Sequence, residues 1–196
     1  MKSPASSKSR LKGYISDERR THLSLALFNE TIIKLKKAIL SLNSQFDIAV
    51  VTESNEINCL SRSKSVKVIS SVETKSLSGY LDAAALWAKE KNYKALCIVP
   101  ADLADPKLSD LEKLLSYPIR HSEMVICPAK DLGTNALFIS PPTAFKFSFG
   151  KKSFLRHLQL AESNYIKPII LPLDSIKKDV DTTEDLDWLL TQKPQF

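Results

Sequence analysis

The sequence predicts an α/β protein in which helices cover a mostly parallel sheet. Short apolar runs rich in β-branched residues alternate with amphipathic segments through most of the 196 residues. With 43% hydrophobic and 26% charged residues, the chain can bury a core without disulfides or metal ions. The sequence shows no repeats, low-complexity segments or shifts in composition, which predicts a single domain over residues 1–196.

The expected elements follow one another along the chain. Ser16 is a typical N-cap residue, and residues 17 to 43 form a long helix because apolar side chains recur there at spacings of three and four. Strands are expected at residues 46 to 52 and 66 to 70, with a helix at residues 76 to 92. The later strands are ALCIVP (95 to 100), MVICPA (124 to 129), NALFIS (135 to 140) and KPIILPL (167 to 173); the later helices are LSDLEKLL (108 to 115), KKSFLRHLQLAES (151 to 163) and TTEDLDWLL (182 to 190).

Charge and hydropathy limit the classes of partner. The formal charge of +6 favours anionic partners. The basic residues are dispersed and no aromatic platform accompanies them, so we expect no nucleic-acid partner. No apolar run reaches the roughly 18 to 20 residues that a membrane-spanning helix needs, which excludes an integral membrane protein.

Two further features bear on location and assembly. The chain has three widely spaced cysteines, an odd number: Cys59, Cys97 and Cys127. Two of them lie in apolar runs. We therefore expect free thiols and a reducing compartment, the cytoplasm. The apolar stripe of the first helix could pack on the core or form a homodimer, and the sequence leaves both open.

Acidic residues follow the predicted strands, where parallel sheets bind ligands. Asp102 directly follows a strand and could hold Mg²⁺, although a lone aspartate there is more often a turn or cap residue. Asp179 and Asp181 lie two apart in an extended segment, so they project to the same face and could complete a metal site. Thr182 and Asp185 fit a capping box, which makes Asp185 structural.

Two other segments could bind anions. The first 20 positions hold six basic and two acidic residues. This pattern is typical either of a solvated chain terminus or of a loop that binds a polyphosphate, and taken alone it favours the solvated terminus. Gly150 and Ser153 place N–H groups and a hydroxyl at a helix start, where an anion can bind. The segment is not a P-loop, because Phe145 stands where that motif requires glycine.

The remaining polar residues give weaker signals. Thr134 and Asn135 read by themselves as a polar turn that leads into a strand. The histidines are scattered and form no nucleophilic arrangement with serine or cysteine, and we expect His22 and His157 on helix surfaces.

Five motifs, taken in order, carry a resemblance. They are K-x5-KSRL (2 and 8 to 11), PADL (100 to 103), GTNAL (133 to 137), FGxxSFxRHL (149 to 158) and DVDTxEDL (179 to 186). Together they resemble the 2-phospho-L-lactate guanylyltransferase family over nearly the whole chain, and GTNAL with FGxxSFxRHL is the most specific pair. The resemblance implies a Rossmann-like (GT-A-like) nucleotidyltransferase fold, a three-layer sandwich. It also implies transfer of GMP from GTP to 2-phospho-L-lactate, phosphoenolpyruvate or 3-phosphoglycerate, with release of pyrophosphate, in coenzyme F-420 biosynthesis.

The same resemblance implies roles for particular residues. Lys2, Lys8 and Arg10 would contact the GTP triphosphate, while Asp102, Asp181 and Asp179 would hold Mg²⁺, with Lys8, Arg10 and Asp102 as the catalytic groups. Gly79 and Asp82 would lie near the guanine; Thr134, Asn135, Gly150 and Ser153 would bind the acceptor. Such a site needs no general base, because the attacking phosphate is already ionised.

The sequence departs from the family in two places. The family usually shows G-L-N-x-A where this chain has GYLDAAA, so Asp82 could accept hydrogen bonds from guanine or cap the helix that follows, and both stay open. An apolar strand precedes K-x5-KSRL in the family, whereas here Met1 directly precedes Lys2. We therefore expect the first, central strand to be absent from this sequence, which would expose sheet edges on both sides.

Two alternatives stand beside this interpretation, and the second follows from the missing strand. One is a nucleotidyltransferase of the same fold that uses another acceptor. The other is a truncated, inactive homologue with a binding or regulatory role.

Overall fold

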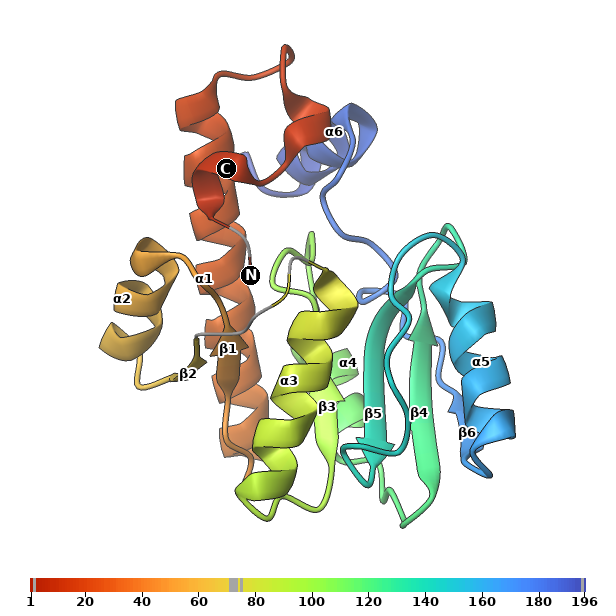
Figure 1. Cartoon of the computed structure of the whole chain (residues 1–196). Helices are drawn as coiled ribbons and strands as arrows, with labels where there is room; N and C mark the ends of the chain where they lie inside the picture. The colour runs from red at the N-terminus through yellow and green to blue at the C-terminus, as the bar shows by residue number, and fades with distance from the viewer. Residues whose placement is uncertain (2, 71–73, 75, 195) are drawn as a thin grey trace.

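The four central strands form a mixed sheet in the order β3-β5-β4-β6 (Figure 1). The computed structural model describes residues 1–196 except 2, 71–73, 75 and 195. The strands are β3 (Leu96–Ile98), β4 (Glu123–Pro128), β5 (Thr134–Ser140) and β6 (Lys167–Ile170). β4 and β6 are parallel, while β5 is antiparallel to both of its neighbours. The start of β5 therefore lies at the sheet edge where β3 and β4 end.

A second, smaller sheet pairs β1 (Ala49–Val51) with β2 (Lys67–Ile69) in parallel. Among the described residues, no backbone ladder joins β1 to β3, so each of these strands has an open edge. Met1 lies beside the end of β1, where its ammonium group donates to the Val51 carbonyl and its own carbonyl accepts from Thr52 Oγ1 at 2.9 Å. Burial lowers the pKa of the Met1 amine to about 6.

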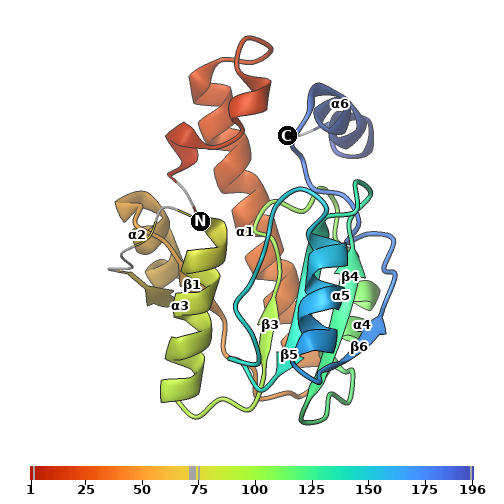
Figure 2. The ribbon, with the colours of Figure 1, turned by 45° about the vertical axis from the view of Figure 1, so that its right-hand side comes forward.

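Helices cover both faces of the larger sheet, which gives three layers (Figures 1 and 2). The helices are α1 (Asp17–Ser41), α2 (Asn55–Ser63), α3 (Leu77–Glu90), α4 (Leu108–Leu115), α5 (Ser153–Ser163) and α6 (Thr183–Gln192), with short 3-10 turns η1 (Pro4–Ser6) and η2 (Ser9–Leu11). Side chains alternate along β4: Val125 and Cys127 pack toward α1 and α4, whereas Met124 and Ile126 pack toward α3 and α5.

Each helix and strand expected from the sequence is present, although several strands are shorter than expected. Ser16 caps α1 by accepting from the Arg19 N–H. One further helix, α2, was not expected from the sequence; it is short, buries Ile57 and is capped by Ser54.

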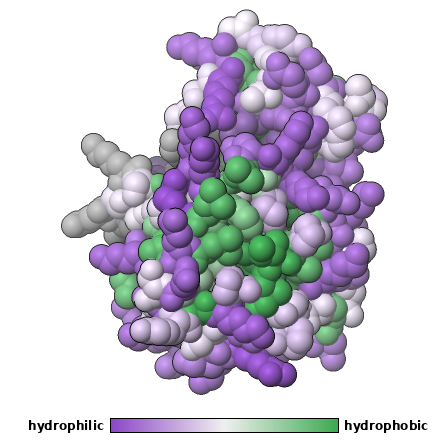
Figure 3. Space-filling model, turned by 90° about the vertical axis from the view of Figure 1, so that its right-hand side faces the viewer, coloured by the Kyte–Doolittle hydropathy of each residue, from purple (hydrophilic) through white to green (hydrophobic). Residues whose placement is uncertain are grey.

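The apolar stripe of α1 packs on the core, which decides between the two readings of that face. Leu23, Leu27, Phe28 and Ile32 are buried, each at most 4% exposed. The exposed apolar area shown in Figure 3 instead lies over α5 and β6, where Leu155 and other apolar residues line a shallow groove.

The cysteines agree with the expectation of free thiols. The three cysteines are free; Cys127 is buried, Cys97 is half-buried and Cys59 is exposed. Burial raises the pKa of the Cys127 thiol to about 12 and also raises that of Cys97. Within the described part of the chain, no helix combines the length and apolar character needed to cross a membrane.

Candidate active site

Three aspartates meet beyond the end of β3. Residues 101 to 104 run antiparallel to residues 178 to 180: the Val180 N–H donates to the Asp102 carbonyl at 3.2 Å, and Leu103 forms a bridge with Asp179. One carboxylate oxygen from each of Asp102, Asp179 and Asp181 lies within 4.8 Å of the others. The structure thus brings together the three aspartates that the sequence marked as metal ligands.

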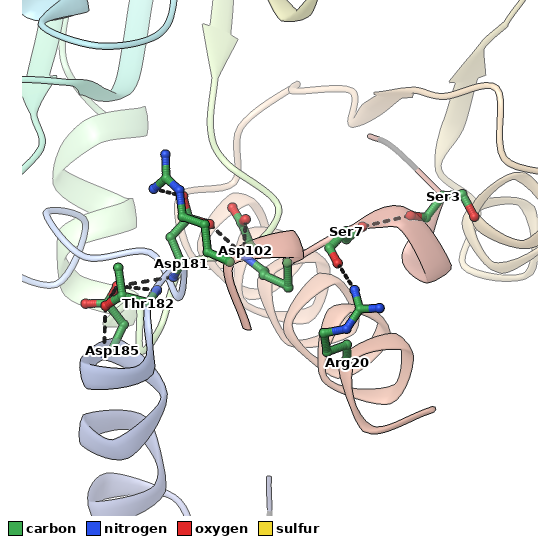
Figure 4. A network of polar contacts seen from close by, with 9 residues as sticks. Ser3, Ser7, Arg20, Asp102, Asp181, Thr182 and Asp185 are labelled. Atoms are coloured by element: carbon green, nitrogen blue, oxygen red, sulfur yellow. Dashed lines mark hydrogen bonds and ion pairs between the residues drawn. The ribbon is translucent and has the colours of Figure 1, made fainter. Parts of the chain in front are cut away.

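The start of α6 holds Asp181 in place. Asp185 Oδ2 accepts from the backbone N–H groups of Asp181 at 3.2 Å and Thr182 at 3.0 Å, and from Thr182 Oγ1 at 2.9 Å (Figure 4). The Thr182 hydroxyl in turn accepts from the Asp185 N–H, which completes a capping box. The predicted structural role of Asp185 is confirmed, and this cap fixes the backbone beside the cluster.

Negative charge accumulates in this cluster. Burial, followed by repulsion from Asp102 and Asp181, raises the pKa of the Asp179 carboxyl to about 6. The ammonium group of Lys8 donates to Asp102 and lies 3.4 Å from Asp181 Oδ1, and its side chain is only 3% exposed. Arg10 Nη1 lies 3.3 Å from Asp181 Oδ2, with 71% of its side chain exposed. Three carboxylates thus face one buried ammonium and one exposed guanidinium.

The donor set fits Mg²⁺. Mg²⁺ is usually bound through one or two carboxylates together with substrate phosphates, and it prefers hard oxygen ligands. Burial is the main cause of the raised pKa of Asp179, and repulsion from Asp102 and Asp181 adds to it; a divalent cation would relieve that repulsion.

A buried arginine fixes the basic loop. Arg20, on α1, is 5% exposed. Its Nη1 donates to the Ser7 carbonyl at 2.7 Å, and its Nη2 donates to Asp17 Oδ1 at 2.7 Å. Ser7 Oγ donates to the Ser3 carbonyl at 2.8 Å, which continues the network in Figure 4. Sequence reasoning missed this role, although Arg20 falls in register with the buried Leu23 and Leu27 of the same helix. Lys2 lies outside the described residues.

A second polar cluster forms where β5 begins. Thr134 Oγ1 lies 3.0 Å from His157 Nδ1 and 3.1 Å from Ser153 Oγ. All three residues are at most 8% exposed. β5 pairs antiparallel with β3 through Ile98↔Leu137, so Thr134 lies three residues beyond that pair, on the side toward which the chain continues to Asp102. The hydroxyl and carboxylate clusters therefore share one edge of the sheet.

The loop before α5 contacts this cluster through the Ser148 N–H, which donates to His157 Nε2 at 3.1 Å. Gly150 has φ +116, a value that L side chains rarely adopt. Arg156 Nε donates to Ser148 Oγ at 2.8 Å, and its Nη2 donates to the Ser148 carbonyl at 3.0 Å. The first two N–H groups of α5 donate to the Gly150 and Leu132 carbonyls. Both amides are thus already engaged in backbone hydrogen bonds, and the Ser153 hydroxyl donates to Thr134.

Comparison with known proteins identifies the family. Residues 1–192 match the family described as "Guanylyl transferase CofC like". The chain belongs to this family. It is therefore a nucleotidyltransferase of the guanylyltransferase type.

Individual relatives act on different acceptors. The chain is 33% identical over 190 residues to the 3-phospho-D-glycerate guanylyltransferase of Colwellia psychrerythraea, covering 96% of this chain and 88% of the relative. It is 30% identical over 180 residues to a 2-phospho-L-lactate guanylyltransferase of Methanocaldococcus vulcanius, covering 91% and 76%. It is 28% identical over 185 residues to a phosphoenolpyruvate guanylyltransferase of Roseiflexus sp., covering 94% and 80%.

A solved structure supports the fold. A crystal structure described as a nucleotide-diphospho-sugar transferase from Desulfovibrio desulfuricans G20 superposes with a TM-score of 0.71 and 17% identity, covering 100% of this chain and 86% of that one. The predicted nucleotidyltransferase-type α/β fold is thus confirmed.

The start of α3 in this guanylyltransferase differs from one expectation. Ser76 caps α3, and Asp82 lies within the helix, so the reading of Asp82 as a helix cap is wrong. Asp82 Oδ1 accepts from the Phe147 N–H at 2.8 Å instead. Through this bond, Asp82 positions the segment that leads to Gly150.

Gly79 lies in the first turn of the same helix. A Cβ on Gly79 would lie 2.3 Å from Thr74 Oγ1, so glycine permits this close approach.

Two other polar residues of the site motifs are buried. Asn135 donates from Nδ2 to the Ile176 carbonyl at 2.8 Å, which ties β5 to the segment before Asp179. The expectation that His157 lies on a helix surface is wrong, because it is completely buried. Phe145, Phe147 and Phe149 surround its ring. The position of His157 within the FGxxSFxRHL motif was the signal that could have indicated a buried role. The apolar period of α5 alone did not show that the helix face carrying His157 is covered.

Proposed function

We propose that this chain transfers GMP from GTP to a phosphorylated three-carbon acid, with release of pyrophosphate, as a cytoplasmic enzyme of coenzyme F-420 biosynthesis. The acceptor is 2-phospho-L-lactate, phosphoenolpyruvate or 3-phosphoglycerate. The observation that carries this proposal is the placement of the Asp102 carboxylate cluster and the Thr134 hydroxyl cluster at the same sheet edge. The free thiols support the cytoplasmic location.

The proposed reaction needs little covalent chemistry from the protein. An oxygen of the acceptor phosphate attacks the α-phosphorus of GTP, and the bond to the leaving pyrophosphate breaks. Because that phosphate is already ionised, the protein has to align the two substrates and neutralise charge. A reaction without a general base agrees with a site in which the histidine, His157, is buried and enclosed by aromatic rings.

Asp102, Asp179 and Asp181 would hold Mg²⁺ in this proposal. When bound, Mg²⁺ supplies neutralisation of the triphosphate charge. Lys8 and Arg10 would contact the triphosphate beside it, and Lys2 has the same proposed role. Arg10 suits this role because 71% of its side chain is exposed at the cluster.

The acceptor would bind where β5 and α5 begin. Thr134 and Ser153 would contact its anionic oxygens, and the Gly150 loop would close over them, with Asn135 supporting the segment. The relatives named for these three acceptors are 28% to 33% identical to this chain. Gly79 and Asp82 would lie near the guanine.

Pyrophosphate release tests the proposal directly. The protein is incubated with MgCl₂, GTP and each of the three acids in turn, with ATP in place of GTP as the base control. We expect release with GTP and one acid above the others. The absence of release with every acid would overturn the proposed reaction, while release with ATP at an equal rate would overturn the choice of base.

A further inference from the structure

The tautomer of His157 is defined by its contacts. His157 Nε2 accepts the Ser148 N–H at 3.1 Å, and a backbone N–H can only donate. Nε2 therefore carries no proton, and the neutral ring bears its proton on Nδ1. Burial, with a smaller effect of Arg156, lowers the pKa of His157 to about 4, so the ring is neutral near pH 7.

The surroundings hold this arrangement in place. The ring centroids of Phe145, Phe147 and Phe149 lie 6.1, 6.4 and 4.7 Å from that of His157. Arg156 binds both the carbonyl and the hydroxyl of Ser148, the residue whose N–H selects the tautomer. The imidazole thus has a fixed donor side and a fixed acceptor side.

The donor side determines how the two hydroxyls use their protons. His157 Nδ1–H donates to Thr134 Oγ1 at 3.0 Å, and Ser153 Oγ donates to the same oxygen at 3.1 Å. The two hydroxyls carry two protons, and the Ser153 proton is used in the bond to Thr134. The imidazole accepts neither proton, so the Thr134 proton remains free to be donated. Within the described part of the chain, no oxygen accepts it.

The opposite tautomer would remove that donor. If Nδ1 were unprotonated, Thr134 would donate to it and Ser153 would donate to Thr134, which uses both protons. The pair would then present only lone pairs to an incoming ligand, and lone pairs repel anionic oxygen.

We propose that His157 is a positioning residue that makes the Thr134 and Ser153 hydroxyl pair a hydrogen-bond donor toward an anionic oxygen of the acceptor. This inference rests on the proposed function, which places the acceptor at that pair. His157 acts through the two hydroxyls and touches neither substrate.

The tautomer can be measured on the unaltered protein. Long-range ¹⁵N–¹H NMR of labelled protein separates His157 from His22 and His121, which are exposed. We expect a fixed Nδ1–H tautomer for the buried histidine between pH 6 and 8. A protonated Nε2, or a mixture of tautomers, overturns the proposal without reference to catalysis.

Two substitutions separate positioning from simple support of the loop. The amide nitrogen of His157→Asn can replace Nδ1 as donor to Thr134, whereas the amide oxygen of His157→Gln can replace Nε2 as acceptor of the Ser148 N–H. We expect His157→Gln to raise the acceptor KM about tenfold, the typical effect of a hydrogen bond to a charged group, while His157→Asn stays within about twofold of the unaltered protein. The KM for GTP should be unchanged in both. The reverse order, equal acceptor defects, or an equal rise in the GTP KM would assign His157 a purely structural role.

Phosphate binding separates failure of this inference from failure of the proposed function. If no acid supports pyrophosphate release, the reaction is wrong, but calorimetry with inorganic phosphate still tests the hydroxyl pair. We expect about tenfold weaker binding to His157→Gln than to His157→Asn. Equal affinities, or no binding to the unaltered protein, would overturn the inference.

Discussion

The Lys8 ammonium group contacts the carboxylate of Asp102, 94 positions further along the chain. The same ammonium lies 3.4 Å from Asp181, so a single cation is shared between two of the three clustered carboxylates. A divalent cation at this cluster would compete with Lys8 for the same oxygens. Binding of the metal would free the ammonium to face a phosphate.

Replacing Lys8 with methionine should therefore have opposite effects on the two ligands. Lys8→Met removes the competing charge, so we expect Mg²⁺ alone to bind several-fold more tightly, because cation repulsion at such distances is worth about 1 kcal/mol or more. The KM for GTP should rise, because a phosphate partner is lost. Calorimetry with MgCl₂ and steady-state kinetics measure the two effects; weaker Mg²⁺ binding would contradict the competition.

Asp102→Asn should abolish metal-dependent turnover. Loss of one charged ligand at the reacting phosphates should lower kcat by about 100-fold or more. The rise in Tm on adding MgCl₂ should also shrink, since ligand binding stabilises the folded state.

Asp174→Asn is the matched control for that substitution. The Asp174 side chain is 94% exposed and pairs with Lys177 outside the cluster. The Asp174→Asn variant should retain both turnover and the magnesium-dependent rise in Tm. If both variants lost turnover and the rise in Tm equally, Asp102 would not belong to the metal site.

The buried histidine should make stability depend on pH. The pKa of His157 is lowered to about 4, against 6.5 in the unfolded chain. Between these values the unfolded state binds a proton that the folded state does not, so the free energy of unfolding falls as the pH falls from 6.5 to 4. Above pH 6.5 and below pH 4 this group adds no slope. The total loss is on the order of 3 kcal/mol.

Urea unfolding across that pH range measures the effect. His157→Asn removes the titrating ring and should flatten the part of the slope that it causes, whereas His22→Asn, at an exposed position, should keep it. Parallel curves for the unaltered protein and His157→Asn would show that the histidine is not buried neutral.

Gly150→Ala should weaken acceptor binding more than its strain alone would. Gly150 and Gly13 both have positive φ, +116 and +90, and a Cβ at either position has space. Each alanine should therefore cost about 1 kcal/mol of stability through backbone strain. Only Gly150→Ala, in the loop that contacts the cluster of Thr134 and Ser153, should raise the acceptor KM. Equal KM values in both variants would separate this loop from the acceptor.

Local patterns in the sequence predicted most elements and several caps. Ser16 caps α1, and Thr182 with Asp185 forms the capping box of α6, because these bonds join residues three apart. The pairing of Asp179 and Asp181 followed from the alternation of an extended segment. The helix α2 was missed because its nine residues offer too few apolar positions to show a helical period.

Long-range contacts decided the roles that the sequence left open or assigned wrongly. Asp82 bonds the Phe147 N–H, 65 positions away, rather than capping a helix. Burial of His157 depends on three phenylalanine rings that cover one face of α5, and the α5 sequence does not contain them.

The sequence by itself determined the α/β class, the family motifs and the residues that carry charge at the site. Only the tertiary structure placed Lys8 against Asp102, joined Thr134 to Ser153 and His157, and left the sheet divided between β1 and β3. The physical reason is range: helical period and caps depend on neighbours within about one turn, whereas burial, tautomer and pKa depend on segments that meet only when the sheet assembles.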